Sequence, residues 1–111
     1  MDCVFCKIIN GEVRSNIVYE DDYVVAFNDL NPMAPTHILI VPKKHIATIL
    51  DISDADADII GKINLAAKKI AEKFKFEDFR LVANCGRDAG QSVFHIHYHF
   101  LAGRRFAWPP G

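Results

Sequence analysis

The sequence lacks the features that mark membrane-spanning and nucleic-acid-binding proteins. It has no basic tract and no apolar run near the roughly 20 residues that cross a bilayer. Its 13 Lys and Arg residues are balanced by 14 Asp and Glu residues, which gives a net charge of −1 with histidines neutral. Proteins that grip nucleic acid through its phosphates need clustered basic residues. We therefore expect no membrane segment and no nucleic-acid partner, whereas a small nucleotide is compatible with this charge.

Cysteine is also scarce. Only three cysteines occur in 111 residues, two of them as Cys3-x-x-Cys6. That number is too small for a disulfide-built scaffold and fits a reducing compartment. The chain opens M-D-C, without the apolar segment of a secretory signal. We therefore predict a cytoplasmic location.

The apolar pattern predicts one α+β domain over residues 1–111. A short N-terminal helix is expected over residues 4–9, because Asn10-Gly11 suits the turn that ends a helix. One long helix is expected to begin at Ser53, since apolar residues then recur at helical spacing as far as Phe74. β-rich runs predict strands at residues 17–20, 23–27, 37–41, 79–83 and 92–101. This order of elements predicts a mainly antiparallel sheet.

The stretch F-H-I-H-Y-H-F, residues 94–100, places three of the five histidines at alternate positions. Alternate residues of a strand share a face, so His95, His97 and His99 are expected together on one side. The opposite face is expected to be core and comprises Phe94, Ile96, Tyr98 and Phe100. Same-face residues lie about 6–7 Å apart, which is long for three ligands on one ion with bonds of about 2.0 Å. Three interpretations are open: histidines without a special role, a metal site, and a catalytic row with one imidazole as nucleophile.

The same stretch carries a family resemblance. His95-Ile96-His97-Tyr98-His99-Phe100-Leu101 matches the His-φ-His-φ-His-φ-φ signature of the histidine triad (HIT) family. Four further segments, in matching order, resemble its Hint branch: Ala34-Pro35-Thr36-His37, Val41-Pro42-Lys43-Lys44-His45, Gly90-Gln91-Ser92-Val93 and Trp108-Pro109-Pro110-Gly111. The resemblance implies a HIT-like antiparallel sheet. It also implies a homodimer that hydrolyses nucleoside 5′-phosphoramidates, cleaving the P–N bond between a purine nucleotide and an amine.

The resemblance assigns roles to four candidate catalytic residues. His97 would be the nucleophile that attacks phosphorus and carries the nucleotide as a covalent intermediate. His99 would contact the phosphate and assist the leaving group. His37 would help to hold the nucleophile or the phosphate, and Ser92 would relay a proton to the departing nitrogen.

The resemblance also implies a nucleotide-binding set. Asp29 would accept hydrogen bonds from both ribose hydroxyls, although a turn or capping role is commoner for such an aspartate. Asn84 would bind near the ribose and phosphate, and the amides of Gly90-Gln91-Ser92-Val93 would donate to phosphate oxygens. Trp108 would reach the partner subunit's site. The purine would be enclosed by apolar residues that singly read as plain core, namely Val4, Phe5, Ile8, Phe27 and Leu30.

The Cys3-x-x-Cys6 pair has three interpretations of its own. The cysteines could be small buried residues, a redox pair, or two ligands of a tetrahedral zinc ion. No thioredoxin-like βαβ context supports the redox interpretation. Some HIT relatives with this pair use two histidines that correspond to His45 and His95. The resemblance thus implies a zinc ion that staples the fold and takes no part in the reaction.

Two other functions stay open. One is a dinucleotide polyphosphate hydrolase or nucleotidyltransferase of the same fold, against which Ser92 and the Trp108 tail weigh. The other is a nucleotide- or zinc-binding adaptor with vestigial activity. Asn28, Cys85 and Arg87 depart from the common Hint pattern, so the preferred amine and the choice between adenine and guanine are left undetermined.

Overall fold

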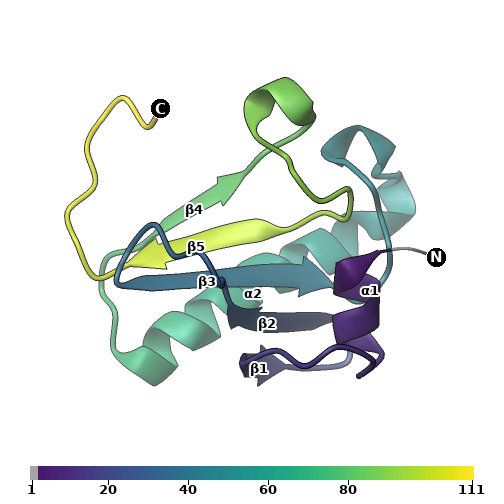
Figure 1. The fold of residues 1–111 in the computed structure, drawn as a ribbon, viewed down its shortest axis with the longest axis horizontal. Coiled ribbons are helices and arrows are strands. Elements are labelled where there is room, and N and C mark those ends of the chain that lie inside the picture. The colour runs from purple at the N-terminus through teal and green to yellow at the C-terminus, as the bar shows by residue number, and fades with distance from the viewer. Residues whose placement is uncertain (1–2) are drawn as a thin grey trace.

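The computed structural model describes residues 3–111, and a five-stranded sheet forms its centre (Figure 1). The strands are β1 (Ile17–Glu20), β2 (Val24–Asn28), β3 (Thr36–Pro42), β4 (Arg80–Ala83) and β5 (Tyr98–Ala102). Their order is β1-β2-β3-β5-β4, and every neighbouring pair is antiparallel. The predicted α+β fold with an antiparallel sheet is confirmed.

The long helix α2 (Ala57–Phe74) covers one face of this sheet (Figure 1). Its predicted apolar stripe is buried at Ile63, Ala66, Ala67 and Ile70, but Phe74 at the last turn is 42% exposed. The helix also starts later than Ser53. Ser53 caps a short 3₁₀ turn, η2 (Asp54–Asp56), whose Asp56 carboxylate pairs with Lys44 at 2.6 Å.

The short helix α1 (Val4–Ile9) lies on the opposite face, as predicted for residues 4–9. The alternation of β-strand side chains separates the two layers. Even-numbered residues of β2 and β3, such as Ala26 and Ile40, pack with α2. Odd-numbered residues, such as Phe27 and Leu39, pack with α1. The chain therefore builds two small cores, one on each side of the sheet.

The strand expected over residues 92–101 is much shorter, since β5 begins only at Tyr98. Tyr98 pairs with Ile40, so the next residues back would have to pair with the end of β3 at Pro42. Proline has no N–H and cannot continue a ladder of hydrogen bonds. The expectation for Phe94 was consequently wrong, because it lies outside the strand and is 49% exposed. Ile96 and Phe100 are buried as predicted, and Tyr98 packs partly buried against the α2 core.

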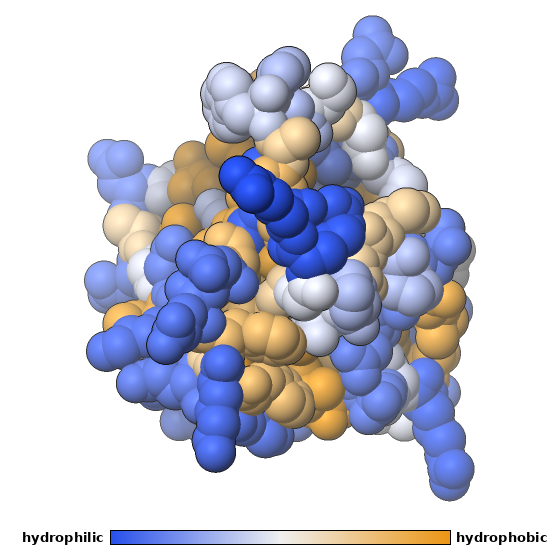
Figure 2. Space-filling view, turned by 90° about the vertical axis from the view of Figure 1, so that its left-hand side faces the viewer, coloured by the Kyte–Doolittle hydropathy of each residue, from blue (hydrophilic) through white to orange (hydrophobic). Residues whose placement is uncertain are grey.

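The C-terminal tail leaves β5 at the end of the molecule seen in Figure 2, where hydrophilic and apolar side chains are interleaved. An open depression of about 710 Å³ lies there, lined by residues 75–80 and 103–106. It contains no histidine or cysteine. No helix between residues 3 and 111 combines the length and apolar character that a bilayer crossing requires.

Gly103, just after β5, generates a stability prediction. Its φ is +97°, and an added Cβ would lie 2.9 Å from Cβ of Pro35. Gly103→Ala is therefore expected to lower the free energy of unfolding by about 1–3 kcal/mol. Gly61→Ala is the control, because it lies within α2 with nothing within 4 Å of the new methyl group. That change should raise the free energy by about 0.5–1 kcal/mol in urea unfolding. Equal effects of the two substitutions would contradict this account.

Candidate functional site

The α1 face of the sheet carries a cleft of about 300 Å³. One row across the sheet crosses its floor, because His99 of β5 pairs with Leu39 of β3, which pairs with Phe27 of β2. His97, His99 and Ser92 line the polar part of the cleft, together with Asp29. Residues of α1 line the apolar part. The cleft therefore joins a titratable region to an apolar wall.

His97 presents one bare ring nitrogen. Its Nδ1–H donates to the main-chain carbonyl of His95 at 2.8 Å, which assigns the proton of the neutral ring to Nδ1. Nε2 then carries the lone pair. The ring is buried, lines the cleft, and meets Phe5 edge-on at 5.2 Å between centroids. A buried neutral imidazole with its lone pair free has the form that a nucleophile or base requires.

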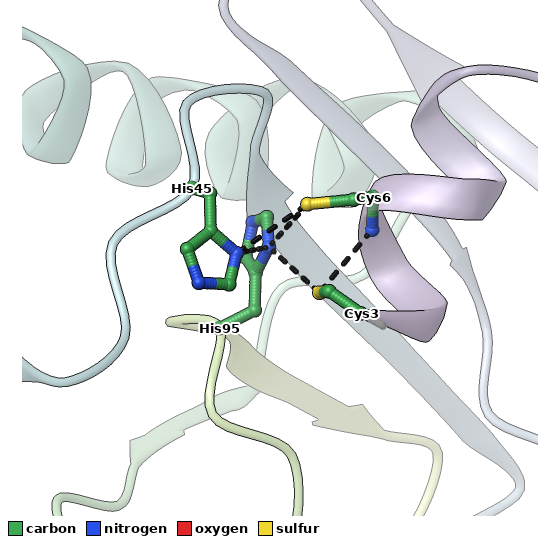
Figure 3. Close-up of side chains that lie close together, drawn as sticks. All are labelled: Cys3, Cys6, His45 and His95. Carbon is green, nitrogen blue, oxygen red and sulfur yellow. Dashed lines mark hydrogen bonds between the residues drawn. The ribbon is translucent and has the colours of Figure 1, made fainter. Parts of the chain in front are cut away.

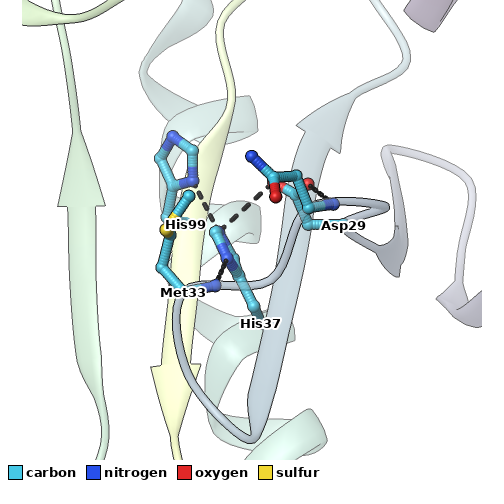
Figure 4. A network of polar contacts seen from close by, with 5 residues as sticks. Asp29, Met33, His37 and His99 are labelled. Atoms are coloured by element: carbon cyan, nitrogen blue, oxygen red, sulfur yellow. Dashed lines mark hydrogen bonds and ion pairs between the residues drawn. The ribbon is translucent and has the colours of Figure 1, made fainter.

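His37 and His99 form a directed hydrogen-bond chain (Figure 4). The Met33 N–H donates to Nδ1 of His37 at 2.9 Å, so the His37 proton belongs on Nε2. That Nε2–H faces Nδ1 of His99 at 2.8 Å and a carboxylate oxygen of Asp29 at 3.4 Å. Because Nδ1 of His99 accepts, the His99 proton belongs on Nε2. This series of hydrogen bonds orients the rings of His37 and His99 without requiring either histidine to be charged.

The directions in which the pKa values of His37 and His99 are shifted agree with neutral rings. Burial lowers the pKa of His37, against the opposing effect of Asp29. Burial, followed by the neighbouring His97 and His37, lowers the pKa of His99 to about 4, again against Asp29. Both directions arise because a low-dielectric surrounding disfavours the charged imidazolium. His99 is therefore an uncharged hydrogen-bond donor at neutral pH.

A second cluster lies beside this cleft and joins Cys3, Cys6, His45 and His95 (Figure 3). Its four donor atoms all lie within 4.8 Å of one another. Nδ1 of His95 is 3.4 Å from Sγ of Cys3, 3.6 Å from Sγ of Cys6 and 3.1 Å from Nδ1 of His45. A tetrahedral zinc separates two nitrogens by about 3.3 Å and a sulfur from a nitrogen by about 3.6 Å. The cluster can hold a metal ion.

The tautomer of His95 suits such a site. Its Nε2–H donates to the carbonyl of Pro42 at 2.8 Å, which leaves the lone pair of Nδ1 pointing at the two cysteines. Burial is the first cause that raises the pKa of the Cys6 thiol, and Cys3 adds to it. A bound cation would oppose this effect by favouring the thiolate.

Asp29, His37 and His99 also lie close enough to share an ion. Their donor atoms are already committed to one another and to main-chain amides. Nδ1 of His37 accepts from Met33, and Asp29 accepts from the Asn31 N–H at 2.8 Å. This trio is therefore better explained as a hydrogen-bond chain than as a metal site.

The structure brings most of the predicted nucleotide-binding residues together. Ten line the cleft: Val4, Phe5, Ile8, Phe27, Asp29, Leu30, Ser92, Val93, His97 and His99. Leu30 is 99% exposed, so the plain-core interpretation does not apply to it. His37 supports His99 from outside the lining.

Four predicted residues lie elsewhere. Gln91 is buried, and its side chain bonds the Gly86 amide and the carbonyls of Ala47 and Val93, so it braces the loop. The amides of Gly90 and Gln91 already donate to the carbonyls of Arg87 and Gly86, so neither is free for a phosphate. Asn84 lies against Gly90, not in the cleft. Trp108 is 83% exposed in the tail and does not line the cleft of its own chain.

Sequence reasoning missed four lining residues, namely Val13, Arg14, Ser15 and Leu39, and named Asn28 only as a departure. Leu39 could have been found, because its odd position in β3 places it on the face of His37. The other three belong to the connection between α1 and β1, whose path over the cleft no local pattern reveals.

Comparisons of this sequence with protein families and with individual proteins point to the same family. The HIT domain profile matches residues 10–106. An uncharacterised HIT-like protein of Synechocystis is 47% identical over 99% of this chain and 97% of its own length. A 14 kDa zinc-binding protein of Zea mays is 45% identical over 97% of this chain and 87% of its own.

Solved structures agree. A HIT family hydrolase from Legionella pneumophila is 48% identical and superposes with a TM-score of 0.96, covering 99% of this chain and all of that one. A histidine triad protein from Clostridium difficile is 55% identical with a TM-score of 0.93, over 96% of this chain and 95% of its own. The chain therefore belongs to the HIT domain family.

Proposed function

We propose that this chain hydrolyses nucleoside 5′-monophosphate phosphoramidates, the adenylate or guanylate conjugates of amines. The observation that carries the proposal is the hydrogen bond at Nδ1 of His97. A main-chain carbonyl accepts the Nδ1–H at 2.8 Å, so in the neutral ring the lone pair is on Nε2, in a cleft that can hold a nucleotide. The relatives described as HIT family hydrolases support the reaction class.

In this mechanism Nε2 of His97 attacks the α-phosphorus and the P–N bond breaks. The amine leaves with a proton that comes from solvent water and is relayed by the Ser92 hydroxyl at the cleft. A water molecule then attacks phosphorus, the bond between phosphorus and Nε2 breaks, and the water gives a proton back to solvent, which releases the nucleoside monophosphate and restores the neutral ring. His99 donates its Nε2–H to a phosphate oxygen, and His37 holds His99 in position. In the turn of residues 90–93, the amides of Gly90 and Gln91 are already hydrogen-bonded, so the amides of Ser92 and Val93 would be the phosphate donors.

The row across the cleft floor orders the rest of the nucleotide. With phosphate at His99, the ribose contacts Asp29, which follows the end of β2 and lies close to His37 and His99. The base then lies over Leu39 and Phe27. The apolar wall of α1 closes over the base. Trp108 does not line this cleft within one chain, and we place it at a homodimer interface. A light-scattering mass above the 12.5 kDa of one chain would support the homodimer.

His97→Ala and His97→Asn are expected to reduce turnover of an adenosine phosphoramidate at least about a thousandfold, because no other group can form the intermediate. AMP binding, measured by calorimetry, should survive. Because the P–N bond of a nucleotidyl-histidine is labile in acid and persists in base, mass spectrometry of alkali-quenched protein should show a covalent adenylate on the unmodified chain and none on either variant. Unchanged turnover would rule out the mechanism, and faster turnover of a diadenosine polyphosphate would favour the alternative hydrolase.

The lowered pKa of His99 generates a pH prediction. In the unfolded chain this imidazole titrates near 6.5, and in the folded chain near 4. The unfolded state thus binds the proton first, and the free energy of unfolding falls as the pH drops through this window. His99→Asn keeps an acceptor for His37 but removes the titration. Its free energy of unfolding in urea should fall less between pH 7 and pH 4.5 than that of the unmodified chain. Parallel losses in the two proteins would contradict the prediction.

We propose that the ion held by Cys3, Cys6, His45 and His95 is zinc. The mixed sulfur and nitrogen donor set and its spacings support zinc, as does the relative called a zinc-binding protein. When bound, zinc would supply a fixed tetrahedral link between α1, the segment after β3 and the segment before β5. All four positions would be filled by protein, so no position is open for a substrate.

Elemental analysis of protein purified without added metal should find one zinc per chain. Cys3→Ser and Cys6→Ser should lose most of it and melt at a lower temperature, because a structural metal contributes its binding energy to folding. Cys85→Ser is the control, since Cys85 is a free cysteine outside the cluster. Zinc retained by both cluster variants, or an absence of zinc in the folded unmodified chain, would refute the assignment.

A further inference from the structure

The helix α1 belongs to both sites of the molecule. Cys3 and Cys6 of the metal-binding cluster bracket its first turn, where Sγ of Cys3 accepts from the Cys6 amide at 3.4 Å. Val4 and Phe5, between those cysteines, line the cleft. An isolated helix of six residues is far too short to be stable in water. Its position therefore depends on what its side chains hold.

Phe5 links the two sites physically. Its buried ring lies 5.9 Å from the ring of His95, in the cluster, and 5.2 Å from the ring of His97, in the cleft. The same ring packs edge-on against Phe27 on the cleft floor at 5.5 Å. A shift of Phe5 would change the wall that faces a bound base and the packing against His97.

His95 provides a second link through the main chain. Its ring is held between the Pro42 carbonyl and the two cysteines. Its own carbonyl accepts the Nδ1–H of His97 and so sets the tautomer of that ring. The residue that would ligate the ion thus also orients the ring nitrogen exposed to the cleft.

We propose that the Cys3, Cys6, His45 and His95 cluster positions the nucleotide cleft, so that metal and nucleotide each strengthen the binding of the other. The proposal rests on the proposed function, because it takes a nucleotide as the ligand of the cleft. With the ion bound, α1 is anchored and the wall is already formed when the nucleotide arrives. Without it, the nucleotide must order α1 at the expense of affinity.

The test is a thermodynamic cycle on the full chain with zinc and AMP. Calorimetry measures AMP affinity for zinc-loaded and for chelator-stripped protein, and we expect at least about a fivefold loss on stripping. Competition with a chelator of known affinity measures zinc binding with and without saturating AMP. Because coupling of equilibria is reciprocal, AMP should tighten zinc binding by the same factor.

Two variants sharpen the cycle. Phe5→Leu keeps all four ligands but removes the ring that contacts both His95 and His97. This variant should therefore retain zinc and show a smaller coupling factor. Cys85→Ser leaves both sites intact and should reproduce the factor of the unmodified chain.

The outcomes separate the two hypotheses. Equal AMP affinity with and without zinc would overturn the coupling and leave the proposed function standing. AMP binding to neither form would overturn the proposed function, and the coupling with it. If the stripped chain unfolds, zinc affinity that is unchanged by AMP in the loaded protein would overturn the coupling on its own.

Discussion

Hydrogen bonds from imidazole N–H groups to main-chain carbonyls determine what His95 and His97 can do. A neutral imidazole has one N–H, so the carbonyl that takes it decides which nitrogen is left bare. Pro42 takes Nε2–H of His95, and the bare Nδ1 points to the cysteines. His95 takes Nδ1–H of His97, and the bare Nε2 is left for the cleft. Two histidines that are nearly adjacent in sequence thereby belong to a cluster that can hold a metal ion and to a candidate reaction centre.

Pro42 makes this division possible. It ends β3 without an N–H, so residues 92–97 are free of the ladder and can turn His95 away from the cleft. An unbroken strand would have placed His95, His97 and His99 in one row on one face. The end of the strand thus separates a residue that can bind metal from two that can contact substrate.

Much of this could be predicted from the sequence where one local rule was sufficient. Period-two alternation correctly separated Ile96 and Phe100 from His97 and His99, because those residues lie on or beside β5. It failed at Phe94, since pairing with β3 had already ended. The engaged amides of Gly90 and Gln91 could not be foreseen either, because their acceptors depend on how the whole loop closes. Only the family resemblance predicted that His45 and His95 join the two cysteines of the N-terminal segment. No local pattern could predict it, because these histidines lie far along the chain and meet the cysteines only when α1 packs on the sheet.

The two cores on opposite faces of the sheet divide the tasks of the molecule by residue parity. In β2, β3 and β5, even positions such as Ala26, Ile38 and Phe100 pack under α2, while odd positions such as Phe27, Leu39 and His99 face the cleft. Substitutions at neighbouring positions of these strands are therefore expected to have different effects. Changes at Ala26, Ile38 and Phe100 would alter thermal tolerance, whereas changes at Phe27 and Leu39, which line the cleft, would alter which ligands are accepted. A combinatorial library confined to Phe27 and Leu39 would explore new ligands while the core under α2 stays unchanged.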